Sequence, residues 1–209
     1  MYRWQVMERL ARRGVVGIVR ATDARAAEKA ALRVVDDGLD VVEISLTTPG
    51  ALTAIARVVA ARPDAVIGAG TVLDEMSARL AALAGARFLV CPSLHPAVLA
   101  CGHRYGLAVL PGVGSATEIV TALEAGADAV KLFPARAFTP DVLRDLLQAL
   151  PQAPVVPTGG VDAGCAPQWI AAGAIAVGMG GALTSGGAEA VGDLLESITA
   201  ARRPTERAD

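Results

Sequence analysis

The sequence predicts an α/β protein with the architecture of a (β/α)8 barrel, or TIM barrel, formed as a single domain by residues 1–209. Short apolar runs alternate with amphipathic stretches eight times along the chain, and each such pair is typical of one strand followed by one helix. The runs lack strict alternation of apolar and polar residues, which indicates strands covered on both faces and joined in parallel by helices. A length of 209 residues suits eight such units. A doubly wound open sheet is the alternative architecture.

The first unit joins an expected strand at 15–20 to a helix at 23–37. Asp23 suits the N-cap of that helix, and Gly38 suits its end. The second strand, at 41–45, precedes a helix at 49–61, where Pro49 suits the first turn. The other six units are 65–69 with 74–84, 87–91 with 95–103, 107–110 with 115–125, 128–132 with 140–149, 154–157 with 164–172, and 175–178 with 186–201.

Glycines recur where a predicted helix gives way to the next strand. Gly38, Gly85, Gly126 and Gly173 all occupy this position, and we interpret them as one repeated way of ending a helix. No segment has the composition of a linker between domains. The polar residues 202–209 are expected to form a frayed tail.

The composition argues against several classes of function. A net charge of −2 and an aromatic content of 3% do not suit a nucleic-acid-binding protein. Three separated cysteines make a disulfide framework improbable, and two histidines make a metal site improbable. Neither a membrane span of about 18 apolar residues nor a signal peptide is recognisable. We therefore expect a soluble cytoplasmic protein.

Lys131 is the most informative residue. It and Lys29 are the only lysines among 19 basic residues, and Lys131 lies in the apolar run 129–134, which predicts a buried strand. Burying an ammonium is costly, whereas the free amine of a lysine is a nucleophile that can form a Schiff base. Taken alone, the segment leaves two interpretations open, a Schiff-base lysine or a lysine at a strand end whose amine reaches water.

Unusual residues stand at the predicted carboxyl ends of several strands. In a (β/α)8 barrel these ends surround one mouth, where active sites are built. Their convergence favours the catalytic interpretation of the lysine. The residues are Arg20, Glu43, Thr71, Pro92, Lys131, Thr158 and Gly178.

Glu43 and Arg20 are the charged candidates beside the lysine. A carboxylate inside the apolar run 41–45 needs a partner or a raised pKa, and Glu43 is a candidate general acid and base. The alternative is a structural ion pair with Arg20 or Lys131. Arg20 could instead bind a carboxylate or phosphate of the substrate.

Two glycine pairs follow the last two predicted strands. Gly159-Gly160 and Gly178 with Gly180 stand where such barrels often bind phosphate through backbone N–H groups. Tight turns alone are the alternative. The glycine pairs at 68–70 and 112–114 do not form a dinucleotide-binding fingerprint, and we interpret both as turns.

Seven segments together resemble the class I 2-keto-3-deoxy-6-phosphogluconate (KDPG) and 4-hydroxy-2-oxoglutarate aldolase family over residues 15–182. They are Gly-Ile-Val-Arg at 17–20, Val-Glu-Ile at 42–44, Gly-Ala-Gly-Thr-Val at 68–72, Cys-Pro at 91–92, Leu-Pro-Gly at 110–112, Val-Lys-Leu-Phe-Pro at 130–134 and Pro-Thr-Gly-Gly-Val at 157–161.

The resemblance implies a (β/α)8 barrel that forms a homotrimer and needs no cofactor. By position, Lys131 would be the Schiff-base lysine and Glu43 the acid and base. The resemblance also implies a substrate pocket and a phosphate site. The pocket residues would be Arg20, Thr71, Pro92, Phe133 and Thr158, and the phosphate would be bound at Gly159, Gly160, Gly178 and Gly180.

Some positions depart from the phosphogluconate pattern. Thr47 stands where members acting on phosphogluconate derivatives carry arginine, and Leu-Thr-Thr-Pro at 46–49 is closer to the 2-dehydro-3-deoxy-6-phosphogalactonate aldolase branch. The segments 137–140 and 168–170 favour the same branch, whereas Thr158 resembles the phosphogluconate branch. Gly181 replaces a serine that phosphate-using members carry, which keeps an unphosphorylated 2-keto acid open as substrate.

The expected function is therefore cleavage of a 2-keto-3-deoxy-6-phospho sugar acid to pyruvate and glyceraldehyde 3-phosphate. An aldolase for an unphosphorylated acid such as 4-hydroxy-2-oxoglutarate is one alternative. A phosphate-binding barrel enzyme without imine chemistry is another, and a catalytically inactive metabolite-binding protein is a third. The sequence does not choose the configuration at C4.

Overall fold

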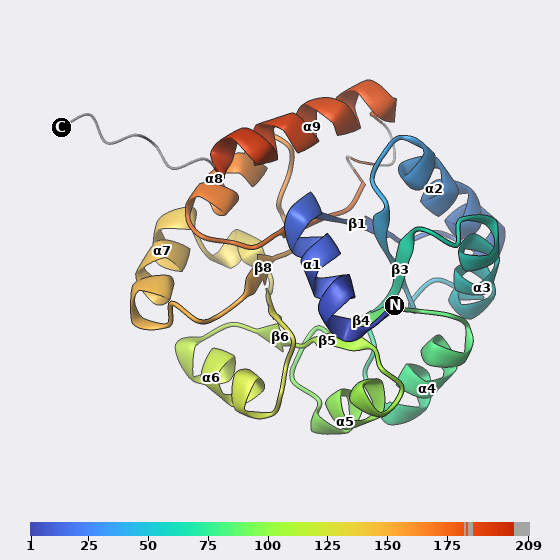
Figure 1. Cartoon of the computed structure of the whole chain (residues 1–209), viewed down its shortest axis with the longest axis horizontal. Helices are drawn as coiled ribbons and strands as arrows, with labels where there is room; N and C mark the ends of the chain where they lie inside the picture. The colour runs from blue at the N-terminus through green and yellow to red at the C-terminus, as the bar shows by residue number, and fades with distance from the viewer. Residues whose placement is uncertain (182, 184–185, 203–209) are drawn as a thin grey trace.

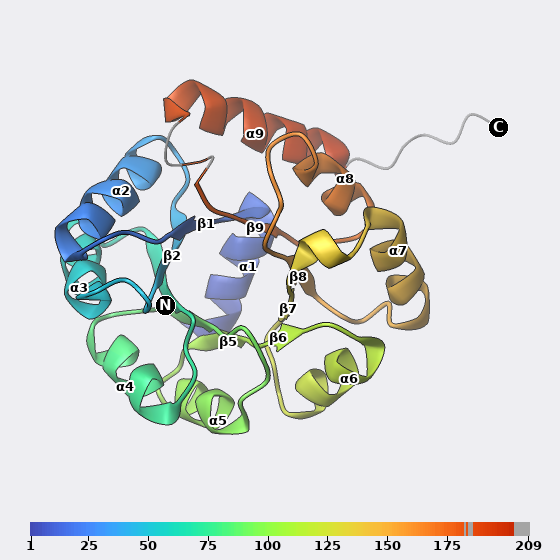
Figure 2. The ribbon, with the colours of Figure 1, turned by 180° about the vertical axis from the view of Figure 1, so that it is seen from behind.

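The computed structural model describes residues 1–181, 183 and 186–202, and it is a closed barrel of parallel strands inside a ring of helices (Figures 1 and 2). The predicted (β/α)8 architecture is therefore confirmed and the open sheet is wrong. The strands are β1 (Val15–Val19), β2 (Val41–Ser45), β3 (Val66–Gly70), β4 (Phe88–Val90), β5 (Ala108–Leu110), β6 (Gly112–Val113), β7 (Val130–Leu132), β8 (Val155–Pro157) and β9 (Val177–Met179).

Hydrogen bonds between neighbouring strands close the barrel. Six strands form one parallel sheet in the order β5-β4-β3-β2-β1-β9, and β6-β7-β8 form a second. A bridge between Thr158 and Gly178 joins β8 to β9. Only Pro111 separates β5 from β6, and a proline lacks the N–H that a continuous ladder needs. The two short pieces together make the fifth of eight barrel strands.

The helices follow the strands as the sequence predicts, with ends that differ from the predicted ones by at most two residues. The side chain of Asp23 accepts a hydrogen bond of 2.9 Å from the Ala26 N–H and caps its helix. The four helix-ending glycines have φ between 92° and 108°, which confirms their predicted role. These helices are α2 (Ala24–Asp36), α3 (Ala51–Ala61), α4 (Glu75–Leu83), α5 (Pro96–Arg104), α6 (Ala116–Glu124), α7 (Pro140–Ala149), α8 (Ala166–Ala171) and α9 (Gly187–Ala201).

Helix α1 (Arg3–Arg13) is a helix that the sequence analysis did not assign. It lies across the amino-terminal end of the barrel (Figure 1), where Val6 and Leu10 pack onto the apolar layer inside the strands. These two side chains stand four residues apart on one face of the helix. Because most other positions of α1 are exposed or half-buried, its apolar signal in the sequence is weak.

Ion pairs and a hydrogen bond from Arg202 hold α1 in place. Asp40, just before β2, contacts Arg9 and Arg13 at 2.6 Å each. Burial alone would raise the pKa of Asp40, but these two guanidinium groups outweigh it and hold the pKa below its usual range. Arg202 donates a hydrogen bond of 2.8 Å to the carbonyl oxygen of Arg12. Arg202, the first residue of the predicted tail, is therefore held by a hydrogen bond, and residues 203–209 lie outside the described part.

The core has two layers that the sheet separates. An outer cluster fills the space between strands and helices, and an inner cluster fills the lower half of the barrel with residues such as Phe88, Leu110 and Val156. In the described residues, no helix is both long and apolar enough to cross a membrane. The upper half of the barrel interior is left for polar side chains.

Candidate active site

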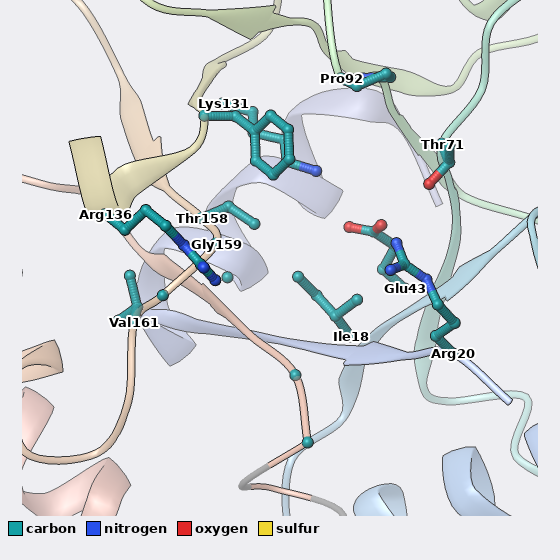
Figure 3. A pocket seen from close by; sticks show the side chains of 15 residues that line it. Ile18, Arg20, Glu43, Thr71, Pro92, Lys131, Arg136, Thr158, Gly159 and Val161 are labelled. Carbon is teal, nitrogen blue, oxygen red and sulfur yellow. The ribbon is translucent and has the colours of Figure 1, made fainter. Parts of the chain in front are cut away.

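A cavity of about 550 Å³ opens at the carboxyl ends of the strands (Figure 3). Its lining includes every one of the eleven site residues singled out in the sequence, although they come from positions 20 to 180 of the chain. These residues are Arg20, Glu43, Thr71, Pro92, Lys131, Phe133, Thr158, Gly159, Gly160, Gly178 and Gly180.

Strand periodicity explains why polar side chains gather here. Successive side chains of a strand point to opposite faces, so residues two apart share a face. Ala129, just before β7, belongs to the inner apolar cluster, and Lys131 lies two residues further along, within β7. Val41 and Glu43 repeat the pattern on β2. The same inward face is therefore apolar at the bottom of the barrel and reactive at its mouth.

Lys131 lies on β7 with 6% of its surface exposed, and its amine points into the cavity (Figure 3). Its backbone N–H donates a 2.8 Å hydrogen bond to the carbonyl oxygen of Pro111, which fixes the strand at this point. Among the described residues, the amine forms neither an ion pair nor a hydrogen bond with another side chain. This burial does not fit a lysine whose amine reaches bulk water. The amine is free to meet a substrate carbonyl.

Glu43 lies on β2 with 3% of its surface exposed, and its carboxyl group enters the same cavity (Figure 3). Burial raises the pKa of this carboxyl group, and the nearby charges of Lys131 and Arg20 oppose the rise. The structural ion pair considered from the sequence is not formed with either residue in the part of the chain described. A buried carboxyl group with a raised pKa can both accept a proton from a substrate and return it.

The glycines at 68 and 70 make room for side chains from neighbouring strands. They lie within strand β3, so their interpretation as a turn is wrong. A methyl group on Gly70 would overlap the Glu43 carboxyl group, and one on Gly68 would lie 2.5 Å from the Phe88 ring. Gly112 likewise lies within β6, and a methyl group there would overlap the backbone of Pro92. All three glycines are required by close approach inside the barrel.

Thr71 follows β3 in a backbone conformation that a threonine seldom adopts. Its φ is +59°, and it is the one described residue other than glycine with a positive φ. Its hydroxyl group is hydrogen-bonded at 2.9 Å to the hydroxyl group of Ser45 at the end of β2. Such local strain is concentrated at functional sites, and here it places a hydroxyl group on the wall of the cavity.

Glycines form the opposite wall of the cavity. Gly159 and Gly160 follow β8 with φ of +90° and +95°, values that a side chain would make unfavourable. Gly178 packs so closely on Thr158 that a methyl group there would overlap the Thr158 hydroxyl group. Gly180 leaves its wall open, because a methyl group there would meet only one atom, at 3.9 Å. The backbone is thus accessible to a ligand along this wall.

Four further lining residues were not selected from the sequence. Ile18 lies on the inward face of β1 next to Glu43, and Val161 and Gly181 border the glycine wall. Arg136 follows the lysine strand in the short 3-10 helix η1 (Ala135–Ala137). A charged residue so soon after the Lys-Leu-Phe-Pro segment is a signal that could have identified it.

Cys91 is a buried neighbour of the site. Burial raises the pKa of its thiol to about 12, with Lys131 opposing the rise and Glu43 adding to it. The thiol therefore stays protonated at neutral pH, as expected of a core residue and not of a nucleophile.

Comparisons with known proteins identify relatives of this chain. Residues 6–200 match the family model described as KDPG and KHG aldolase. A 2-dehydro-3-deoxy-6-phosphogalactonate aldolase of Escherichia coli (strain K12) is 42% identical over 156 residues, which are 74% of this chain and 76% of the relative.

Solved structures show the same likeness. The structure of native KDPGal has a TM-score of 0.81 and 34% identity, and the match covers 90% of this chain and 95% of that one. A KDPG aldolase from Legionella pneumophila, with pyruvate captured at low pH as a covalent carbinolamine intermediate, has a TM-score of 0.77 and 26% identity and covers 94% and 98% of the two chains. With its barrel, its cavity and a family match over most of its length, this chain belongs to the KDPG and KHG aldolase family.

Proposed function

We propose that this protein is a class I aldolase that cleaves a 2-keto-3-deoxy-6-phospho sugar acid to pyruvate and glyceraldehyde 3-phosphate. The observation that carries the proposal is the pairing of a buried lysine and a buried carboxyl group, Lys131 and Glu43, in one cavity. The family membership supports carbon–carbon lyase chemistry, and the lysine supplies the nucleophile that such chemistry needs.

The first half of the reaction builds the imine. The free amine of Lys131 attacks the C2 ketone, and the resulting carbinolamine takes up a proton on its hydroxyl group and loses water to give a protonated imine. Its positive charge forms next to the ring of Phe133, which already lies 4.7 Å from the amine nitrogen. The protonated imine withdraws electrons from C3 and thereby weakens the C3–C4 bond.

The second half breaks that bond and releases both products. Glu43 removes the proton of the C4 hydroxyl group, directly or through a water molecule, and C4 becomes an aldehyde as the C3–C4 bond breaks. The electron pair of that bond moves to C3 and the imine, forming an enamine. Glu43 returns the proton to C3, and water hydrolyses the imine to pyruvate and the free amine.

Reductive trapping tests the lysine directly. Borohydride added with pyruvate should attach one pyruvyl group to Lys131, and mass spectrometry of peptides should locate it. Lys29, the other lysine, is exposed on α2 and provides a matched control. Lys29→Arg should be labelled like the wild type, whereas Lys131→Arg should be neither labelled nor active. Activity that survives Lys131→Arg would instead support a barrel enzyme without imine chemistry.

The substrate branch is the second part of the proposal. We propose the galactonate configuration because the 42% identical relative is a 2-dehydro-3-deoxy-6-phosphogalactonate aldolase and because Thr47 replaces the arginine expected for the gluconate branch. Steady-state kcat/KM for the two 6-phospho acids and for 4-hydroxy-2-oxoglutarate should rank the galactonate substrate first. A higher value for the unphosphorylated acid would favour the alternative aldolase.

We also propose that the protein is a cytoplasmic homotrimer. Three unpaired cysteines in the described chain suit a reducing compartment. An apolar stripe on and before α4 supports self-association, with Leu73, Met76, Leu80 and Leu83 between 42% and 69% exposed. Light scattering should give three times 21.2 kDa. Leu83→Glu should dissociate the assembly, whereas Val142→Glu on α7 should not.

A further inference from the structure

Arg136 lies beside the glycine wall of the cavity, held there by the backbone. The N–H of Ala135 donates a 2.7 Å hydrogen bond to the carbonyl oxygen of Thr158, and the N–H of Arg136 donates one of 2.9 Å to that of Gly159. A methyl group on Gly160 would lie 2.9 Å from Cβ and 3.4 Å from Nε of Arg136. The guanidinium group therefore runs along this wall, as Figure 3 shows.

In the described part of the chain, the side chain of Arg136 has no partner that would explain its position. Within the described residues, its guanidinium group forms no hydrogen bond, ion pair or ring contact with another side chain. Arginines elsewhere in the chain are commonly paired, as Arg62 is with Asp36 and Arg144 with Asp141. A cation lining a cavity without a counter-charge is suited to an anionic ligand.

The charges of the cavity are divided between its two sides. Arg20 lies beside Glu43, whereas Arg136 lies on the opposite side, next to Gly159 (Figure 3). With Lys131, three basic side chains and one carboxyl group line the cavity. A ligand that bears one anionic group at each end would satisfy both arginines, and a ligand with a single anionic group would leave one of them unpaired.

We propose that Arg136 binds the terminal phosphate of the substrate and thereby selects phosphorylated over unphosphorylated sugar acids. This inference rests on the proposed function, because it assigns the phosphate end of the same substrate. A phosphate carries up to two charges and three acceptor oxygens, so it can accept bonds from the guanidinium fork and from backbone N–H groups of the glycine wall together. Arg20 is left to bind the carboxylate at the other end.

Charge and shape at position 136 can be tested separately. Arg136→Gln removes the charge, Arg136→Lys keeps the charge without the fork, and Arg144→Gln is the control because Arg144 is an exposed arginine on α7 outside the cavity. For the phosphorylated acid, kcat/KM should fall about tenfold in Arg136→Gln, mainly through KM, and less in Arg136→Lys. The dephosphorylated acid should show no such loss. Inorganic phosphate should inhibit wild type competitively and Arg136→Gln more weakly.

Three results would overturn the assignment. The first result is an equal kcat/KM of the Arg136→Gln and Arg144→Gln enzymes on the phosphorylated acid. The second is an equal loss on the phosphorylated and dephosphorylated acids, since the residue would then not recognise phosphate. The third is a loss confined to 4-hydroxy-2-oxoglutarate, which would mean that the residue binds a distal carboxylate. Pyruvate trapping on Lys131, measured in the same variants, separates these failures from failure of the aldolase mechanism itself.

Discussion

The amine nitrogen of Lys131 lies 4.7 Å from the centre of the Phe133 ring. At this distance the face of an aromatic ring attracts a cation. The protonated imine of the proposed reaction would be a cation at the position of this nitrogen. The ring is 38% exposed, so it serves the cavity more than the core. Phe133 is thus placed to stabilise the intermediate and not only to pack beside the lysine.

Replacing Phe133 with leucine should weaken imine formation while leaving the fold intact. Loss of the ring face removes about 0.5–1 kcal/mol of attraction for the cation, so the pyruvate concentration for half-maximal borohydride trapping should rise about two- to fivefold. Phe138→Leu is the control, because Phe138 packs against the outer core. If both variants trap pyruvate like the wild type, the ring has no part in stabilising the imine.

Gly70→Ala should displace the carboxyl group of Glu43. The added methyl group would overlap that carboxyl group, and general acid–base catalysis typically contributes about 10²–10⁴-fold in rate. We expect kcat to fall by about 100-fold or more while Lys131 still forms the pyruvate imine. Gly192→Ala on α9 is the matched control, since a methyl group there meets no atom within 4 Å. A Gly70→Ala enzyme with normal kcat would show that Glu43 is not the proton carrier.

The pH profile should report the raised pKa of Glu43. As the base that accepts the C4 hydroxyl proton, Glu43 must be ionised, so kcat/KM should fall as the pH decreases through its pKa. Burial raises that pKa above 4.5, which places the acid limb of the profile above 4.5. Glu43→Gln should lose both the limb and most of the activity. An acid limb that persists in residual Glu43→Gln activity would have to belong to another group.

Asp40→Asn should lower the free energy of unfolding at neutral pH and make that free energy depend less on pH. Arg13 and Arg9 lower the pKa of Asp40 below 3.8 in the folded state, so the ionised carboxylate favours folding above about pH 4. That contribution disappears as the pH falls through the lowered pKa. The free energy of unfolding, measured with urea, should therefore differ less between pH 7 and pH 3 in Asp40→Asn than in the wild type.

Asp36→Asn is the control for this prediction. Asp36 also pairs with an arginine, Arg62, but both side chains are 41% or more exposed, and exposed pairs contribute little to stability. Its unfolding free energy should stay close to that of the wild type at pH 7. An equal loss in the two variants would mean that the contacts of α1 with Asp40 are no stronger than a surface pair.

Local signals in the sequence were enough to predict the (β/α)8 architecture. Asp23 and Gly38 mark the ends of one helix through interactions with backbone groups a few residues away, and this information is local. Alternating apolar runs gave the order of strands and helices, and barrel closure then placed Lys131 and Glu43 at one mouth. Helix α1 was missed because only two of its side chains, Val6 and Leu10, are buried.

Other features depend on contacts that spacing does not reveal. The reason for glycine at position 70 is a side chain 27 residues earlier, on the neighbouring strand. The direction of Arg136 depends on backbone hydrogen bonds from η1 to residues 158 and 159. Both relationships exist only after the barrel closes. Spacing alone therefore predicts a turn at the two glycines of β3, and it gives no role to an arginine between the lysine strand and the next predicted helix.

Helix α1 closes the amino-terminal end of the barrel with Val6 and Leu10. In the described chain, the cavity is therefore open only at the carboxyl ends of the strands. Sugar acid, aldehyde and pyruvate must enter and leave through this same opening, one after another. In the proposed reaction, a pyruvate that is still bonded to Lys131 occupies the cavity, so the aldehyde departs first and the next sugar acid enters only after hydrolysis of the imine. Run backwards for synthesis, the same geometry imposes pyruvate first and aldehyde second.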